Sequence, residues 1–195
     1  MLSKANPNVV GHVLIRDKLT GEILVDKKNA IHYEHMSIAI AKSLSREIDG
    51  FISEMAFGNG ASTVTGTGTV TYFPPRVTGP DADLYNQTYS KVVDDKDPRN
   101  LDATQNKVEV RHVNNTLYTD IIVTATLDYD EPNGQDAFDD ALNVEGNFVF
   151  DEIALKTYSL SLGEGTLLTH VIFNPVQKSL NRLIEIVYTL RITMV

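Results

Sequence analysis

The closing segment of the chain, RLIEIVYTLRITMV, alternates between two kinds of side chain with a period of two. One set of positions is entirely apolar or aromatic: Ile184, Ile186, Tyr188, Leu190 and Ile192. The other set is mixed: Leu183, Glu185, Val187, Thr189 and Arg191. Because successive side chains on a β-strand point to opposite faces, this pattern predicts a strand with one face in a hydrophobic core. Such a strand needs partner strands elsewhere in the chain.

Segments of the same kind are spread along the sequence. β-Branched and apolar patterns predict strands in VVGHVLIR, EILVDKK, FISEMAF, TYSKVV, NKVEVRHV, YTDIIVTATLDY, NFVFDEIALKTY and LLTHVIFNPV. The Thr-Gly pair in DKLTGE predicts a turn between the first two. Strands joined mainly by turns indicate a mainly β fold, and we expect an antiparallel β-sandwich or barrel-like domain. Residues 1–195 contain no internal repeat and no sign of a second unit, so we expect one domain.

One main α-helix is predicted at about residues 33–48. Met36, Ile40, Leu44 and Ile48 recur every four residues, which predicts a buried stripe that packs against the sheet. The Asp-Gly pair at residues 49–50 is expected to end this helix.

Two segments are expected to lie outside the regular core. Residues 74–106 are rich in Pro, Asp and Asn and hold only one short strand pattern, so we expect an extended loop or arm. Residues 128–146 are predicted to form an acidic loop, with a helical turn around Ala137–Leu142. Long loops in compact domains are usually functional, and these two are the segments that we expect to form interfaces.

Composition narrows the classes of function. The formal net charge of −9 argues against binding to nucleic acid. No apolar run approaches the roughly 20 residues that span a bilayer, so no membrane partner is expected. The N-terminal segment lacks the apolar centre of an export signal. The chain has no cysteine, which excludes disulfides and thiolate ligands and suits a reducing cytoplasm.

The pair His32 and His35 raises the question of a metal site. Two imidazoles at this spacing lie near one another on a helix, but zinc needs a third or fourth ligand. The zinc-protease pattern H-E-x-x-H requires histidines four apart, whereas the order here is H-Y-E-H. The alternative is a structural first helical turn, in which the helix dipole favours Glu34. We favour the structural reading and expect no metal ligands and no cofactor.

Other candidate sites have structural alternatives as well. The acidic run DYDEPNGQDAFDD can supply oxygen ligands for calcium, but Pro132 breaks the EF-hand order, so a solvated loop is favoured. The glycine-rich FGNGASTVTGTG lacks the Gly-Lys-Ser/Thr of a phosphate loop. A strand end with positive φ at Gly58 or Gly60 is favoured there.

Nucleophilic catalysis has little support in the sequence. There is no Gly-x-Ser-x-Gly motif, and His12, His112 and His170 lie in strand patterns with no local acid or serine partner. Paired carboxylates stay possible because acids are abundant, but the chain has no Trp for sugar stacking. We therefore expect a protein that is not an enzyme and has no catalytic residues.

Several segments together resemble virion structural proteins of tailed bacteriophages, especially those of T4-like and marine myoviruses. TGEILVDKKNAIHYEHMSIAIAKSL followed by FISEMAFGNGAS is similar to the opening of such proteins. The C-terminal part resembles a pattern of phage tail and tail-fibre-attachment proteins. Its parts are an E-I-(G/A)-L strand at Glu152–Leu155, an F-x-P-(I/V)-x-K strand end at Phe173–Lys178, and a closing strand at Leu183–Ile192. Ala154 stands where glycine is common in that pattern.

This resemblance implies a non-enzymatic virion component, assembled in the host cytoplasm and acting through subunit–subunit interfaces. The expected partners are other copies of the chain, in a ring or trimer, and neighbouring virion proteins. A tail, neck or baseplate accessory protein is the leading expectation, and a capsid decoration protein is the alternative. A host-receptor or carbohydrate-binding module is a further alternative, with Tyr85 and Tyr89 as the residues to mutate. A metal-dependent hydrolase centred on His32 and His35 ranks last.

Overall fold

The computed structural model of the chain describes residues 7–135, 148–179 and 181–194. One five-stranded antiparallel sheet contains the predicted C-terminal strand at its centre. Its strands are β1 (Pro7–Asp17), β2 (Ile23–Lys28), β8 (Lys107–His112), β9 (Tyr118–Leu127) and β12 (Ile184–Met194), in the order β2-β1-β12-β9-β8. β1 and β12 pair along their whole length, from Pro7 opposite Met194 to Asp17 opposite Ile184. We call this the first sheet.

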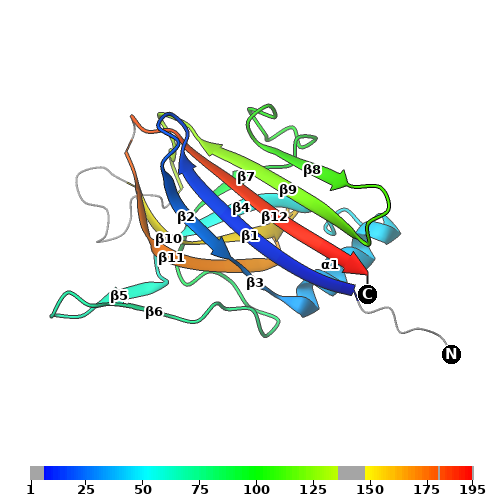
Figure 1. Cartoon of the computed structure of the whole chain (residues 1–195), viewed down its shortest axis with the longest axis horizontal. Helices are drawn as coiled ribbons and strands as arrows, with labels where there is room; N and C mark the ends of the chain where they lie inside the picture. The colour runs from blue at the N-terminus through cyan, green and yellow to red at the C-terminus, as the bar shows by residue number, and fades with distance from the viewer. Residues whose placement is uncertain (1–6, 136–147, 180, 195) are drawn as a thin grey trace.

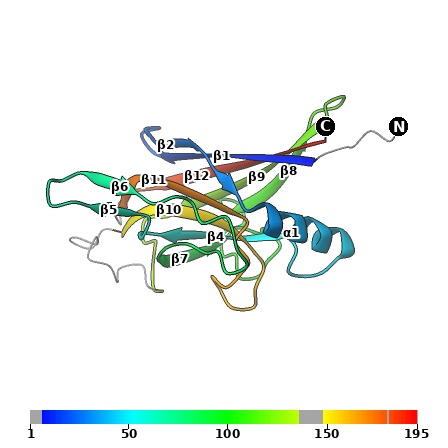
Figure 2. The same ribbon diagram turned by 90° about the horizontal axis from the view of Figure 1, so that it is seen from below.

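The second sheet also has five strands and faces the first. It consists of β3 (Ala30–Ile31), β4 (Ile52–Gly58), β7 (Gln87–Val92), β10 (Phe148–Thr157) and β11 (Thr169–Lys178), in the order β3-β11-β10-β4-β7. The two sheets stack as separate layers, as the views in Figures 1 and 2 show. The expected antiparallel β-sandwich is therefore confirmed, and the sheets do not close into a barrel.

The core lies between the two sheets and follows the predicted alternation. On β12 the positions Ile184, Ile186, Tyr188 and Leu190 are fully buried, whereas their neighbours are partly or fully exposed. Tyr188 also links the layers, because its hydroxyl donates to Thr169 Oγ1 at 2.7 Å. Asn29 Nδ2 donates to the same hydroxyl at 2.8 Å, which satisfies the only polar atom of this buried ring.

Helix α1 (Tyr33–Ser45) crosses one end of the sandwich (Figure 2) and is shorter than predicted. It ends at Arg46, which adopts a left-handed conformation with φ 64°, and not at Asp49-Gly50. The predicted buried stripe is correct only in its first half. Met36 is buried and Ile40 is half-buried, but Leu44 and Ile48 are exposed.

A short hairpin, formed by β5 (Ser62–Val64) and β6 (Val70–Tyr72), projects from the body of the protein (Figures 1 and 2). The sequence predicted only a strand-to-loop transition here. The predicted positive φ at Gly58 or Gly60 is wrong, because neither residue has one. In this region the positive φ belongs to Gly68, in the hairpin turn. Gly58 and Gly60 instead allow close packing: a Cβ on Gly58 would lie 2.5 Å from Glu152 Oε1 and 2.6 Å from Asn86 O.

Residues 74–106 do not form a free arm along their whole length. Strand β7 pairs with β4, and Leu84, Tyr89 and Val93 are buried. The side chain of Gln135 lines the outer edge of β7, where it accepts from Ser90 N–H at 2.8 Å and donates to Ser90 O at 2.9 Å. This segment is therefore largely part of the body, because its apolar side chains complete the core. The predicted helical turn at Ala137–Leu142 lies outside the described residues.

Candidate functional site

The His32–His35 corner is structural in its hydrogen bonding. His32 is the N-cap of α1, and its Nδ1 accepts from the His35 backbone N–H at 3.2 Å. Its Nε2 therefore carries the proton and donates to Gly79 O at 2.9 Å. The two rings stack at 3.6 Å, and His35 Nδ1 donates to Leu167 O at 2.8 Å. His32 thus has no lone pair left for a metal ion.

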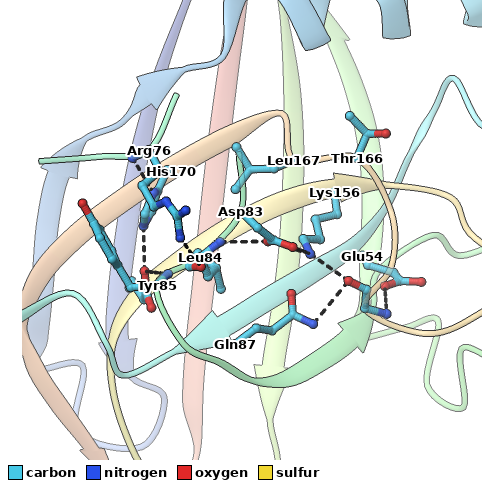
Figure 3. Close-up of polar contacts among 12 residues, drawn as sticks. Glu54, Arg76, Asp83, Leu84, Tyr85, Gln87, Lys156, Thr166, Leu167 and His170 are labelled. Atoms are coloured by element: carbon cyan, nitrogen blue, oxygen red, sulfur yellow. Dashed lines mark hydrogen bonds and ion pairs between the residues drawn. The ribbon is translucent and has the colours of Figure 1, made fainter. Parts of the chain in front are cut away.

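A buried histidine–glutamate pair, whose members are 18 residues apart in the sequence, lies on the outer face of the second sheet. His170 on β11 and Glu152 on β10 are fully buried, with Nε2 and Oε2 2.8 Å apart. Arg76 N–H donates to His170 Nδ1 at 2.9 Å (Figure 3), so the imidazole carries its proton on Nε2 and donates it to Glu152. Both ring nitrogens are therefore occupied by partners within the chain.

Glu152 also binds the backbone that crosses above it. Its carboxylate accepts from the N–H groups of Tyr85, Asn86 and Gly60, at 3.0, 2.9 and 3.3 Å. A carboxylate with this many donors holds a loop in place, because the charged acceptor strengthens each hydrogen bond. Glu152 therefore fastens the 74–86 segment to the sheet. An acid in the middle of the apolar run FVFDEIAL was the sequence signal for it.

Neighbouring charges fasten a second loop in the same way. Lys156 is fully buried, and its Nζ donates to Asp83 Oδ2 at 2.8 Å and to Gly163 O at 2.7 Å (Figure 3). Gly163 N–H donates to Glu54 Oε2 at 2.6 Å. Burial raises the pKa of Glu54, although Gly163 N–H and the charge of Arg99 oppose this. These contacts hold the loop before β11 against β4 and β10.

The side chains of this buried network hold parts of the same chain together. The imidazole of His170, the carboxylate of Glu152 and the ammonium of Lys156 all bind groups of the same chain. A general base needs a free lone pair within reach of a substrate proton, and His170 offers none in this arrangement. Among the described residues, no group of three or more His, Cys, Asp or Glu side chains is arranged to hold a metal ion. Asp136, Asp139 and Asp140 of the acidic loop lie outside the described residues.

The residues expected for carbohydrate stacking do not form a platform. Tyr89 is buried and packs against Phe57 and Phe148 in the core. Tyr85 is half-buried: its hydroxyl donates to Pro74 O at 2.8 Å, and its ring packs on Phe73. Mutation of Tyr89 would therefore destabilise the core, and a loss of glycan binding in that variant would not identify Tyr89 as a binding residue.

An apolar groove of about 880 Å³ lies at the α1 end of the sandwich. It lies between the helix and the first sheet. Its apolar lining comes from Met36, Ala39, Ile40, Leu44, Ile48, Phe51, Ile52, Val108, Val110, Ile121, Tyr158, Leu168 and Ile192. A turn at residues 94–99 forms the rim, where Arg99 pairs with Asp97 and lies 4.9 Å from the ring of Tyr158. We call this feature the α1 groove.

Large apolar side chains in this groove face water. Leu44 is 82% exposed, Val110 73% and Ile48 67%. Single exposed apolar residues are ordinary, but a contiguous patch of them in a concave surface marks an interaction site. The groove holds the outer half of the stripe that the sequence predicted to be buried. The α1 groove is therefore the candidate functional site of the chain.

No protein-family model, no curated protein and no solved structure matches this chain. In the part of the chain that the structure describes, no helix is long and apolar enough to cross a membrane.

Proposed function

We propose that this chain is a non-enzymatic structural protein of a tailed-bacteriophage virion, an accessory component of the tail, neck or baseplate that acts through subunit–subunit interfaces. The observation that carries this proposal is the α1 groove, which is lined by the exposed side chains of Leu44, Ile48 and Val110. An apolar surface of this kind is stabilised when another protein covers it.

Two further features support the proposal. The segments that resemble virion proteins form strands β2, β3, β4, β10, β11 and β12 and helix α1, so they contribute to both sheets and form one wall of the groove. The buried polar side chains of Glu152, His170 and Lys156 serve to fasten loops, which is a structural use of groups that an enzyme would use for chemistry. In this role the protein is assembled in the host cytoplasm and works in the particle.

The test is to locate the chain in particles. Virions are purified from a lysate in which the chain is expressed, and its copies per particle are counted by quantitative mass spectrometry and placed by immunogold labelling. We expect several copies per particle, clustered at the tail, neck or baseplate. Label clustered with three-fold symmetry on capsid faces would assign the chain to capsid decoration instead. A chain that stays in the soluble lysate and is absent from particles would contradict the proposal.

A further inference from the structure

The β5–β6 hairpin has two chemically different faces. Paired residues in an antiparallel ladder share a face, and neighbours along a strand alternate between faces. Thr63 pairs with Thr71, so one face carries hydroxyl groups. Val64 pairs with Val70, and Ser62 pairs with Tyr72, so the opposite face is mainly apolar.

Most of this apolar face is uncovered within the chain, although the Tyr72 hydroxyl donates to Asn174 Oδ1 on β11 and Ser62 Oγ donates to Asp151 on β10. Val64 is 61% exposed, and Val70 and Tyr72 are also exposed. Natural edge strands are usually protected from pairing by charged residues or proline. No Asp, Glu, Lys or Arg occurs between Glu54 and Arg76, so this hairpin lacks that protection. A projecting hairpin that is both uncharged and apolar on one side is suited to being covered by another protein.

The α1 groove is the matching surface on the same molecule. It is lined mainly by apolar side chains, and it lies at the end of the sandwich that carries α1. The β5–β6 hairpin lies at the opposite end of the long axis in both views (Figures 1 and 2). The hairpin of a chain therefore cannot fill the groove of the same chain, but it can reach the groove of a neighbour.

Charge leaves the uncharged hairpin and the apolar groove as surfaces through which two copies can meet. Each chain has a formal net charge of −9, so two copies repel one another over most of their surface. A contact between an uncharged hairpin and an apolar groove avoids the cost of placing like charges together or of burying unpaired ones. At the rim Arg99 pairs with Asp97, and Lys96 lies in the same turn as Asp94 and Asp95.

We propose that the β5–β6 hairpin of one copy docks by its Val64–Val70–Tyr72 face in the α1 groove of a second copy, head to tail. This inference rests on the proposed function, because it names the partner of the interface that the function requires. The contact joins two different surfaces and is therefore heterologous, so its repetition generates a closed ring if the rotation closes and a filament if it does not.

The absence of native cysteine allows a direct test by cross-linking. Two single-cysteine variants, Val64→Cys in the hairpin and Leu44→Cys in the groove, are each treated with a short bis-maleimide, alone and as an equal mixture. We expect a cross-linked dimer in the mixture and little in either variant alone. The chain that carries both cysteines should give a ladder of oligomers. Leu19→Cys, an exposed leucine on the β1–β2 turn, replaces Leu44→Cys in the control mixture and should give no dimer.

Three results would overturn the inference. A dimer from Leu44→Cys alone would mean that two grooves face one another. Equal cross-linking with Leu19→Cys would mean random collision. A wild-type chain that stays monomeric by light scattering up to its solubility limit, with no cross-link in the mixture, would mean that the groove is not filled by this chain.

The cross-linking test and the virion test fail independently. If the chain is found in particles at several copies but the mixture gives no cross-link, only the hairpin–groove contact is wrong. If the mixture gives the cross-link but the chain is absent from particles, the self-association stands and the virion function is wrong.

Discussion

At Gly58 the need for glycine arises from the side chain that packs above it. The backbone of Gly58 lies so close to the Glu152 carboxylate and to Asn86 O that a Cβ would meet both within 2.6 Å. Replacement by alanine must push away either a backbone carbonyl or the carboxylate that fastens the 74–86 segment. The sequence marked this glycine as special but supplied the wrong reason, since a dihedral angle is a local property and this contact spans distant residues.

Gly58→Ala is predicted to lower the free energy of unfolding by about 2 kcal/mol, the usual cost of overpacking a tight site. Equilibrium urea unfolding measures this change. The matched control is Gly66→Ala in the hairpin turn, where an added Cβ meets no atom within 4 Å. The control should lie within about 0.5 kcal/mol of the wild type. Equal effects of the two substitutions would refute the packing argument.

Lys178 makes the free energy of unfolding change with pH in the alkaline range. Burial lowers the pKa of this lysine to about 8, against the opposing effect of Glu131 and neighbouring acids. The unfolded chain, whose lysine has a pKa of about 10.4, binds more protons than the folded chain between these two values. The free energy of unfolding that Lys178 contributes therefore rises with pH from about 8 to 10.

Lys178→Met should remove this pH dependence. The free energy of unfolding of the wild type minus that of the variant is expected to increase when the pH is raised from about 7 to 10. Paired denaturant titrations at the two pH values provide the measurement. Lys107→Met serves as the control, since Lys107 lies half-buried in an ion pair with Glu109 at 3.1 Å. A difference that stays constant or decreases with pH would disprove the assignment.

At the scale of elements, most strands could be predicted from the sequence, but which elements pack against one another could not. The alternation in β12 predicted both the strand and its buried face, because a repeat of two residues is the signature of a strand with one face in the core. The α1 stripe shows where this logic ends. Periodicity identifies an apolar face on a helix, but whether another element covers it depends on where the helix lies. Because α1 lies at the end of the sandwich, Leu44 in its last turn and Ile48 just after the helix stay exposed.

The start of α1 depends on an imidazole where serine or aspartate is usual. His32→Ala removes the acceptor for His35 N–H and the donor to Gly79 O, and should cost about 1–2 kcal/mol of stability. Zinc added to the wild type should leave the melting temperature unchanged, as His32 has no free lone pair. His112→Ala, at an exposed histidine of β8, is the control and should be nearly neutral. A zinc-dependent rise in Tm that His32→Ala abolishes would restore the metal hypothesis.

At the scale of the molecule, the hairpin should be separable from the fold. Its strands pair with each other, and residues 63–72 are exposed, so little of the core depends on them. Replacement of residues 63–71 by a Gly-Gly turn is predicted to change the free energy of unfolding by less than about 1 kcal/mol, as for other exposed loops. The same change should abolish self-association in light scattering. A large loss of stability would show that the hairpin supports the body.

The candidate site itself could not be read from the sequence for a related reason. Residues such as Leu44 and Val110 belong to elements far apart in the chain, and only the arrangement of α1 beside β8 makes one groove of them. His170 was similarly set aside for want of a local partner, although Glu152 on the neighbouring strand provides one. Sequence patterns identify the apolar face of each element, whereas a site depends on which elements lie next to one another in the fold.

The pairing of Pro7 with Met194 has a practical consequence for anyone who labels this protein. These two residues lie side by side at the end of the sandwich that carries α1, and Ile192 already belongs to the groove wall. A fluorescent label attached at Pro7 or Met194 would sit beside the surface that we propose a neighbour occupies. A peptide tag inserted in the β1–β2 turn, where Leu19 is exposed and no groove residue is near in sequence, would leave that surface open.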